Sequence, residues 1–593
     1  MEVETIALQK RTSFSLYNET GFCKTMRYHW KFRDIHAVAA EQFDDYLAQK
    51  KLKLLDGKSN DTNSSLLALL PEPSLLKHTD KAAQRLLQAI QNKEKITIFG
   101  DYDVDGTTSC AMLFLFFEEI GYPVDIYIPD RILEGYGFNK IGLQKIAQQG
   151  TQVVVTVDNG ISAVEACEAA LSLGIDVIIT DHHDIPPTLP RAFAILNPKQ
   201  NDCPFPYKML AGVGVAFYLL IALRSLLRSA GHNVNVNLKN LLDFVAIGTI
   251  ADMAPLTGIN HIFCKIGLDV LCCHLTSGNR VGIYQLLKLA GWKEGTPVDA
   301  GDVGFKIGPR LNAAGRLGNA LRSVELLCEK NNDLAISKAT FLHHENSERQ
   351  LLEKKYTQQA FEKVSAFDPL PEALVLFDES WHPGVVGLVA SRVLEKYYRP
   401  VLVFGMIDGK LKGSGRSTHA FNLFSVLNQV RDELVSFGGH YHAVGLTIMP
   451  EKLSWLTSYL AEQARQLISE SQKLPPLYID GNVPIHFLNP NFLKKLEDLE
   501  PYGIENPRTR WLVGPVSVGH VKRIGKDLSQ SHAKVMFIEN GKDFWMTAFG
   551  LAHVFEEHLA TGVELLLVVE AKKSFWNGRD TVDIRVIDYA PVF

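Results

Sequence analysis

The amino-acid sequence predicts an α/β protein in which a parallel-sheet domain, a second α/β domain and a small terminal β-barrel follow one another. Short β-branched runs alternate with helical segments in KITIFG, PVDIYIP, TQVVVTVDNG and DVIITDHH, which is typical of a parallel sheet covered by helices. Residues 332–366 form a charged helical pattern without Pro or Gly. Later β-runs are short, evenly spaced and separated by turns, which favours a small barrel.

These patterns divide the chain into segments. The first α/β pattern starts at Lys95, the second starts with ALVLFD at Ala373, and the break at Pro475-Pro476 precedes the β-rich end. We expect an N-terminal adaptor segment at residues 1–70 and a parallel-sheet domain at residues 71–331. A connecting helix at residues 332–366 then leads to a second α/β domain at residues 367–472 and a β-barrel domain at residues 473–593.

Composition excludes several classes of protein. With 593 residues and about 150 residues per domain, three or four domains are expected, and 46% hydrophobic with 21% charged residues excludes a mainly disordered chain. The net charge of −5 excludes a histone-like polycation, so nucleic-acid binding would need local basic surfaces or metal ions.

The eight cysteines form no CxxC pair, which favours a reducing, cytoplasmic compartment. The N-terminus predicts no signal peptide, and the apolar run Met209–Leu223 predicts a buried helix rather than a membrane span.

Acidic and histidine clusters follow the predicted strands. In GDYDVDG, after KITIF, alternate residues point the same way while the chain stays extended, so two or three of the carboxylates would converge. Their mutual repulsion would be relieved by a divalent cation. The other clusters follow QVVVTV, DVIIT and the helix 241–250, and the residues concerned are Asp101, Asp103, Asp105, Asp158, Asp181, His182, His183 and Asp252.

Each cluster alone also fits an ordinary turn or cap. Three clusters at the same end of consecutive strands, however, supply carboxylates and imidazoles to one locus. This ligand set suits Mn²⁺ or Mg²⁺ better than a structural zinc ion. Two metal ions about 3.5–4 Å apart need roughly six to eight such ligands, and the clusters together provide a set of that size.

The motifs DYDVDG, VDNG, DHH and GTIADMAPL stand in the order found in the DHH phosphoesterase superfamily, and the sequence resembles the bacterial RecJ exonuclease family within it. GPRLNAAGR at 308–316 resembles a segment of that family, while GSGRS at 413–417 and GGHYHAVG at 438–445 resemble the DHH-associated domain. The resemblance covers about residues 70–593 and implies an OB-like fold for the barrel. A family turn at 500–507 departs from the usual pattern at Glu505.

The resemblance implies a metal-dependent 5′→3′ exodeoxyribonuclease specific for single-stranded DNA. It would hydrolyse phosphodiester bonds by two-metal-ion catalysis, release 5′-mononucleotides and act in DNA repair and recombination. The implied cofactors are two divalent metal ions, Mn²⁺ or Mg²⁺. Their implied ligands are Asp101, Asp103, Asp105, Asp158, His182 and Asp252, with Asp105 or Asp158 as the bridge. Asp101 is either a ligand or a residue that orients Asp103.

Further residues are implied for catalysis and substrate binding. His183 is either another ligand or a group that stabilises the scissile phosphate and protonates the leaving 3′-oxygen. The catalytic set is His183, Asp158, Arg310 and His440, and the substrate-binding set is Arg131, Arg310, Arg316, Ser414, Arg416 and Ser417. Arginine suits a terminal 5′-phosphate because its planar fork grips phosphate oxygens in pairs. Helix-end salt bridges remain the alternative for Arg310 and Arg316, and backbone packing remains one for His440.

The barrel offers basic and aromatic residues for single-stranded nucleic acid: Lys522, Arg523, Lys526, Lys534, Phe537, Phe544 and Trp545. Phe537 and Phe544 fit the barrel core equally well. By resemblance the partners are single-stranded DNA with a 5′ end, a single-strand-binding protein and a RecQ-type helicase, and a monomer is expected. The alternative functions are a phosphodiesterase for short oligonucleotides or cyclic dinucleotides, and a non-catalytic DNA-binding scaffold. The terminal barrel argues against a phosphodiesterase for small substrates, and the intact motifs argue against a non-catalytic scaffold.

Overall fold

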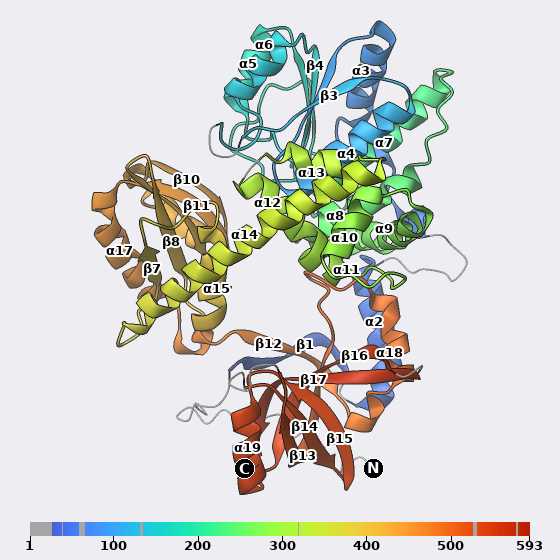
Figure 1. Cartoon of the computed structure of the whole chain (residues 1–593). Coiled ribbons are helices and arrows are strands. Elements are labelled where there is room, and N and C mark those ends of the chain that lie inside the picture. Colours follow the sequence, from blue (N-terminus) through green and yellow to red (C-terminus); the bar gives the residue numbers. More distant parts are fainter. Residues whose placement is uncertain are drawn as a thin grey trace. The chain divides into compact units, whose positions relative to one another are not determined.

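The computed structural model describes residues 27–37, 39–57, 66–130, 134–317, 319–525, 531–576 and 579–592 (Figure 1). The chain forms two compact units. The larger unit comprises the described residues of Leu47–Ile468 and Glu497–Arg508. The barrel unit comprises those of Met1–Tyr46, Ser469–Leu496 and Thr509–Phe593.

A five-stranded parallel sheet organises the first half of the larger unit. Its order is β3-β2-β4-β5-β6, and every neighbouring pair is parallel. The predicted parallel sheet is therefore confirmed. The strand bounds are Ile96–Phe99 (β2), Val124–Tyr127 (β3), Val153–Val157 (β4), Asp176–Thr180 (β5) and Ala194–Leu196 (β6).

Helices cover both faces of this sheet because its strands are apolar on both sides. Ile96, Ile98 and Val155 pack in the core formed with α3 (Thr79–Asn92), α4 (Val104–Glu119) and α7 (Gly212–Ser229). The alternate residues Phe99 and Val154 pack with α5 (Lys140–Gln148) and α6 (Val164–Ser172) on the opposite face (Figure 1). Among the described helices, α7 alone is long and apolar enough to cross a membrane by length and composition, and 61% of it is buried inside the fold.

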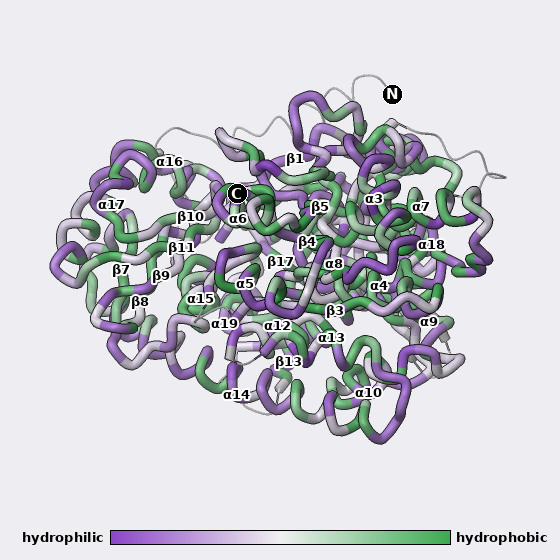
Figure 2. Tube along the Cα trace, turned by 90° about the horizontal axis from the view of Figure 1, so that it is seen from above, coloured by the Kyte–Doolittle hydropathy of each residue, from purple (hydrophilic) through white to green (hydrophobic). Residues whose placement is uncertain are grey.

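A helical layer continues the larger unit beyond the sheet. Its helices are α8 (Leu242–Ala251), α9 (Gly258–Ser277), α10 (Val281–Leu289), α11 (Ala300–Asp302), α12 (Gly308–Leu317) and α13 (Leu321–Leu327). A π-helix, η5 (Val303–Ile307), leads into α12. Helix α14 (Asn332–Ser365) then runs for 34 residues, and its trace alternates between hydrophilic and hydrophobic colours (Figure 2).

The second sheet of the larger unit has the order β10-β11-β9-β8-β7. Strands β7 and β8 are parallel, and the remaining neighbours are antiparallel. The elements are β7 (Leu374–Phe377), α15 (Val386–Tyr397), β8 (Val401–Ile407), β9 (Lys410–Arg416), α16 (Leu423–Asn428), β10 (Ser436–His440), β11 (Ala443–Ile448) and α17 (Leu453–Leu467).

The barrel unit holds a closed barrel, because β13 pairs with both β14 and β16 in the order β13-β14-β15-β17-β16. Strand β1 (His29–Ala37) extends this sheet by pairing in parallel with β12 (Pro476–Asn482). The described N-terminal residues before Leu47 thus belong to this unit. Its other elements are β13 (Arg510–Arg523), β14 (Ala533–Glu539), β15 (Lys542–Ala548), α19 (Ala552–Thr561), β16 (Leu565–Trp576), β17 (Arg579–Pro591) and α18 (Pro490–Leu496), and α2 (Phe43–Leu54) begins in it.

A buried ion cluster anchors the helical layer. Asp243 on α8 is fully buried, accepts a bond from His274 at 2.8 Å and pairs with Arg280 at 2.7 Å. Burial favours the neutral acid, but the Arg280 charge and the hydrogen bonds from His274 and Arg280 hold the pKa of Asp243 below its usual range. This stability is present above the pKa of an unfolded aspartate, about 3.9, and is lost as the pH falls through the lower folded pKa.

We therefore expect Asp243→Asn to destabilise the protein by about 3–5 kcal/mol, because Arg280 would keep a buried charge without its counter-charge. Thermal unfolding at pH 7 should show a melting temperature lower by several degrees. Asp269→Asn, which changes an exposed acid on α9, is the matched control and should change little. Equal melting temperatures for wild type and Asp243→Asn would contradict this account of the cluster.

Candidate functional site

The loop after β2 carries the first acidic cluster. Asp101 is buried, and Asp103 caps α4 by accepting a bond from the Gly106 backbone N–H at 3.1 Å. Asp105 lies in the first turn of α4, so the chain has left the extended conformation before the third acid, while Asp101 and Asp103 still bring ligand atoms together. The cap at Asp103 begins α4 at Val104. A Cβ on Gly106 would lie 2.6 Å from the Asp101 carbonyl oxygen, so glycine is needed where α4 meets the loop.

The N-terminus of α7 fixes Asp105. The backbone N–H groups of Gly212 and Val213 each donate to a different carboxylate oxygen of Asp105 at 2.8 Å. These donors belong to the positive end of the helix dipole, which holds the fully buried carboxylate in place. A Cβ on Gly212 would stand 2.7 Å from Asp158 Oδ1, so α7 approaches both carboxylates closely only because residue 212 is glycine.

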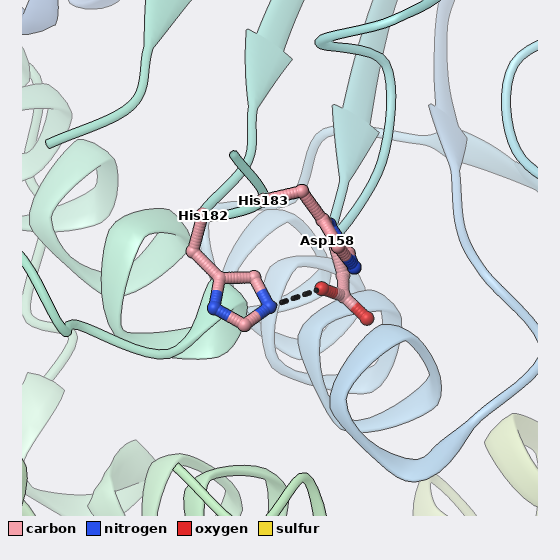
Figure 3. Close-up of side chains that lie close together, drawn as sticks. All are labelled: Asp158, His182 and His183. Carbon is pink, nitrogen blue, oxygen red and sulfur yellow. Dashed lines mark ion pairs between the residues drawn. The ribbon is translucent and has the colours of Figure 1, made fainter. Parts of the chain in front are cut away.

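Asp158 and His182 face each other at the ends of neighbouring strands. His182 Nε2 lies 3.1 Å from Asp158 Oδ1, and Figure 3 shows the two side chains pointing toward each other with His183 alongside. The same nitrogen lies 3.9 Å from Asp105 and 3.8 Å from Asp252, which follows α8 as its C-cap residue. Asp158 itself has a φ of 62°, in the left-handed region.

The predicted metal-ligating residues all converge here. Three overlapping groups each place one ligand atom per residue within 4.8 Å of the others. The groups are Asp101, Asp103 and Asp158; Asp105, His182 and Asp252; and Asp158, His182 and His183.

The electrostatics of the cluster are unfavourable without a cation. Burial and the neighbouring Asp103 charge raise the pKa of Asp105 to about 7. Burial and the charges of Asp105 and Asp103 raise the pKa of Asp158 well above its usual range. Burial, reinforced by His183, lowers the pKa of His182 to about 3, so its ring is neutral, the form that binds metal ions.

The donor set fits two divalent cations. Asp158 Oδ1 and His182 Nε2 are buried and have no hydrogen-bond partner among the described residues. Unpartnered buried acceptors are costly, and a cation would satisfy both while neutralising the surrounding carboxylates. Carboxylates with an imidazole suit Mn²⁺ or Mg²⁺.

The sequence interpretation named Asp181 in the DHH cluster but gave it no role, because within that cluster it considered only His182 and His183. Asp181 is buried and accepts bonds from the backbone N–H of Ile161 at 2.8 Å and of His182 at 2.7 Å. Its Oδ1 also lies 2.7 Å from His183 Nδ1. Burial opposes ionisation of the His183 ring, but the Asp181 charge raises the pKa of His183 to about 9. Asp181 therefore orients the DHH turn.

The sequence interpretation gave no role to two further residues of the site, Tyr136 and the Asn159 of the VDNG motif. Tyr136 places its hydroxyl 3.3 Å from His183 Nε2, and its side chain is 48% exposed. Asn159, fully buried, accepts from the Phe138 backbone N–H at 3.0 Å and donates to the Phe99 carbonyl at 3.2 Å. Asn159 thus ties the Tyr136 loop to the end of β2, a connection that only the folded chain reveals.

The β10–β11 hairpin brings His440 to the same place. His440 Nδ1 lies 3.2 Å from Asp184 Oδ2, and the His440 ring stacks on His183 with ring centroids 6.2 Å apart. Gly439 has a φ of 138°, and a Cβ there would lie 2.3 Å from the Ala443 carbonyl oxygen. Glycine is therefore required for the hairpin to close and to present His440.

A second cluster forms where β9 ends beside the first turn of α15. Arg416 Nη1 donates to Ser414 Oγ at 3.0 Å. A Cβ on Gly387, in the first turn of α15, would lie 3.0 Å from Ser414 Oγ and 3.5 Å from Arg416 Nη2. Arg316 Nη1 donates to the carbonyl oxygen of Gly384, three residues before Gly387, at 3.3 Å. The N-terminal end of α15 and a guanidinium thus lie together, an arrangement suited to an anion.

Other predicted substrate-binding residues have different surroundings. Arg310 is buried and donates to the Lys306 carbonyl at 2.7 Å and to His343 Nδ1 at 3.2 Å. Ser417 is also buried, and its hydroxyl donates to the Phe421 carbonyl at 2.8 Å, so its hydroxyl serves the loop. Arg131 lies outside the described residues.

In the barrel, Phe537 is fully buried and belongs to the core. Trp545 is 48% exposed, and the centroid of its ring lies 5.8 Å from that of His520. Lys534 pairs across the sheet with Lys522, so basic and aromatic side chains share this part of the barrel surface. Lys526 lies outside the described residues.

Comparison with known families agrees with this architecture. The DHH family N-terminal domain matches residues 95–249, the DHHA1 domain matches residues 371–466, and the RecJ OB domain matches residues 479–588. These matches lie on the parallel sheet, the second sheet and the barrel.

Several curated proteins and solved structures are similar to the chain. The single-stranded-DNA-specific exonuclease RecJ of Escherichia coli (strain K12) is 36% identical, covering 81% of this chain and 84% of the relative. RecJ of Bacillus subtilis (strain 168) is 37% identical over 88% of this chain, which spans 64% of that relative, less than two thirds of its length. The crystal structure of RecJ from Thermus thermophilus in complex with Mn²⁺ has a TM-score of 0.76 and 26% identity, covering 95% of this chain and 80% of that chain.

Proposed function

This chain belongs to the RecJ family of single-stranded-DNA-specific exonucleases, and on that premise we propose that it degrades single-stranded DNA from a 5′ end and releases 5′-mononucleotides. The observation that carries this proposal is the cluster in which Asp105, Asp158, His182 and Asp252 meet within a few ångströms. The second candidate function is a phosphodiesterase for short oligonucleotides that uses the same cluster. The barrel, with its exposed Trp545, favours a longer single strand.

We propose that two divalent cations, Mn²⁺ or Mg²⁺, bind in this cluster. The residues that would hold them are Asp101, Asp103, Asp105, Asp158, His182 and Asp252. When bound, such ions supply an activated water at neutral pH and neutralise charge on phosphoryl oxygens. The buried atoms Asp158 Oδ1 and His182 Nε2, which have no hydrogen-bond partner among the described residues, support this assignment.

The histidines beside the cluster would act on the scissile phosphate. Asp181 holds His183 through Nδ1, so His183 Nε2, which lies beside the Tyr136 hydroxyl, is the atom to stabilise the phosphate and to protonate the leaving 3′-oxygen. His440, stacked on His183, would add a donor on the same side. Arg310, which donates only to neutral acceptors among the described residues, would hold nearby backbone phosphate.

The terminal 5′-phosphate would bind at the end of α15. Arg416 and Ser414 offer donors there, and the N–H groups of the first helical turn favour an anion. Arg316 donates to the carbonyl oxygen of Gly384, just before α15, and would lie beside the bound phosphate. Ser417 would hold the loop that follows Arg416. Arg131 completes the proposed set.

We also propose the domain roles expected from the sequence. Residues 71–331 would bind the cations, and residues 367–472 would contain the 5′-phosphate site. Residues 473–593 would form the DNA-binding barrel. Residues 332–366 would connect the first two domains, and residues 1–70 would form an adaptor segment. A single-strand-binding protein and a RecQ-type helicase would be partners of a monomer in the cytoplasm.

The test uses a 5′-phosphorylated single-stranded oligodeoxynucleotide labelled at either end, with Mn²⁺ or Mg²⁺ in parallel reactions. We expect immediate release of the 5′ label as mononucleotide, stepwise shortening of the 3′-labelled strand, and no reaction with a chelator present. Cleavage of dinucleotides or cyclic dinucleotides alone would favour the small-substrate candidate. Binding without cleavage in either metal would overturn the proposal of an enzyme.

A further inference from the structure

We propose that the ring of Tyr441, positioned by His419 and His442, forms a stacking surface for the nucleobase of the 5′-terminal nucleotide. This inference rests on the proposed exonuclease function, because it takes the 5′-phosphate to lie at Arg416 and the next phosphate at the cation cluster. The Tyr441 surface, defined by these three residues, stands at the tip of the β10–β11 hairpin and on the adjoining loop after β9.

The sheet places this surface beside both proposed phosphate sites. Arg416 on β9 pairs with Ala443 on β11, and Ala443 pairs with His440 on β10. Neighbouring strands lie about 4.8 Å apart, so Arg416 and His440 are separated by about 9.6 Å across the sheet. Tyr441 and His442 form the turn that joins β10 to β11 and directly follow the Ala443–His440 pair, so the base of a nucleotide held by Arg416 and His440 would lie beside this turn.

Hydrogen bonds hold the Tyr441 ring although it is 39% exposed. The Tyr441 hydroxyl donates to the His419 carbonyl oxygen at 3.0 Å, and the Tyr398 hydroxyl lies 2.5 Å from His419 Nδ1. The Ser417 backbone N–H donates to the His442 carbonyl at 3.0 Å, which ties the turn to the residue after Arg416. The centroids of the Tyr441 and His442 rings lie 4.5 Å apart, and the two ring planes are inclined by 59°.

An exposed aromatic ring fixed in this way is prepared for stacking. Stacking on an aromatic side chain accepts any base, because every base has a π-face, and it fits an enzyme that must release each nucleotide in turn. Immobilising an exposed tyrosine has an entropic cost. The hydrogen bonds to the His419 carbonyl and from the Ser417 N–H, both on the loop after β9, offset this cost. The hydrogen bonds leave the ring itself available.

The test compares 5′-phosphorylated oligodeoxynucleotides whose terminal nucleotide carries a base or is abasic, under single-turnover conditions. For wild type we expect the first cleavage to be about tenfold faster with the base present. Tyr441→Ala should be about tenfold slower than wild type on the base-bearing strand and unchanged on the abasic strand. Tyr441→Phe, which keeps the ring, should retain most of the wild-type preference.

Trp455→Ala is the matched control, because Trp455 is an aromatic residue 37% exposed on α17 and lies outside the site. It should behave as wild type on both strands. A Tyr441→Ala variant that slows both strands equally, or neither, would overturn the stacking surface while leaving the exonuclease intact. If wild type cleaves neither strand, the proposed function itself fails, and the inference fails with it.

Discussion

Replacing Asp158 with alanine should lower the rate of DNA hydrolysis by on the order of a thousandfold. Asp158 takes part in two of the three ligand groups, and its Oδ1 faces His182 Nε2 at 3.1 Å. Residues that merely support a metal ligand already change activity or affinity by about 10–100-fold, so loss of a residue shared by two groups should have a larger effect. The fold should survive, because removing one of several mutually repelling buried carboxylates relieves their repulsion.

The measurement combines single-turnover hydrolysis with thermal unfolding at increasing Mn²⁺ concentration. Wild type should unfold at a higher temperature as Mn²⁺ rises, since a ligand that binds only the folded state stabilises it. Asp158→Ala should lose most of this shift. The matched control is Asp125→Ala at the start of β3, where a half-exposed acid pairs with Lys95 at the opposite end of the sheet. Full activity of Asp158→Ala, or an undiminished Mn²⁺ shift, would contradict the assignment of the cluster.

The sequence was enough to predict where this cluster lies, because strand ends are local features. The runs KITIF, QVVVTV and DVIIT are β-branched, and the polar residues after them must emerge at the carboxyl edge of a parallel sheet. The topology β3-β2-β4-β5-β6 then places the ends of β2, β4 and β5 side by side. The convergence of Asp105, Asp158 and His182 therefore follows from strand order.

What the sequence could not predict depends on contacts between distant segments. The Gly212 and Val213 N–H groups that hold Asp105 are more than a hundred residues away from it along the chain. The role of Asn159 requires the Phe138 and Phe99 backbones to be adjacent. The buried state of Ser417 arises because its loop folds back on Phe421. None of these contacts has a periodic or compositional signal.

Replacing Arg416 with alanine should remove the preference for a 5′-phosphate. Hydrogen bonds to charged groups contribute about 1.5–3 kcal/mol, so kcat/KM on a 5′-phosphorylated strand should fall by about 10–100-fold. On a 5′-hydroxyl strand, the same variant should differ little from wild type. The reason is geometric: the guanidinium lies beside Ser414 Oγ at 3.0 Å and beside the first turn of α15 at Gly387, so donors converge there.

Arg416→Lys separates charge from geometry. Lysine keeps the positive charge but not the planar fork, so its rate on the 5′-phosphorylated strand should lie between those of wild type and Arg416→Ala. Arg431→Ala, which removes an exposed arginine elsewhere in the same domain, serves as the control and should leave both substrates unaffected. Initial rates on matched strands with 5′-phosphate and 5′-hydroxyl ends give the comparison. If Arg416→Ala lowers both rates equally, Arg416 supports the hairpin that carries His440 rather than reading the end of the strand, since β9 pairs with β11 at Ala443.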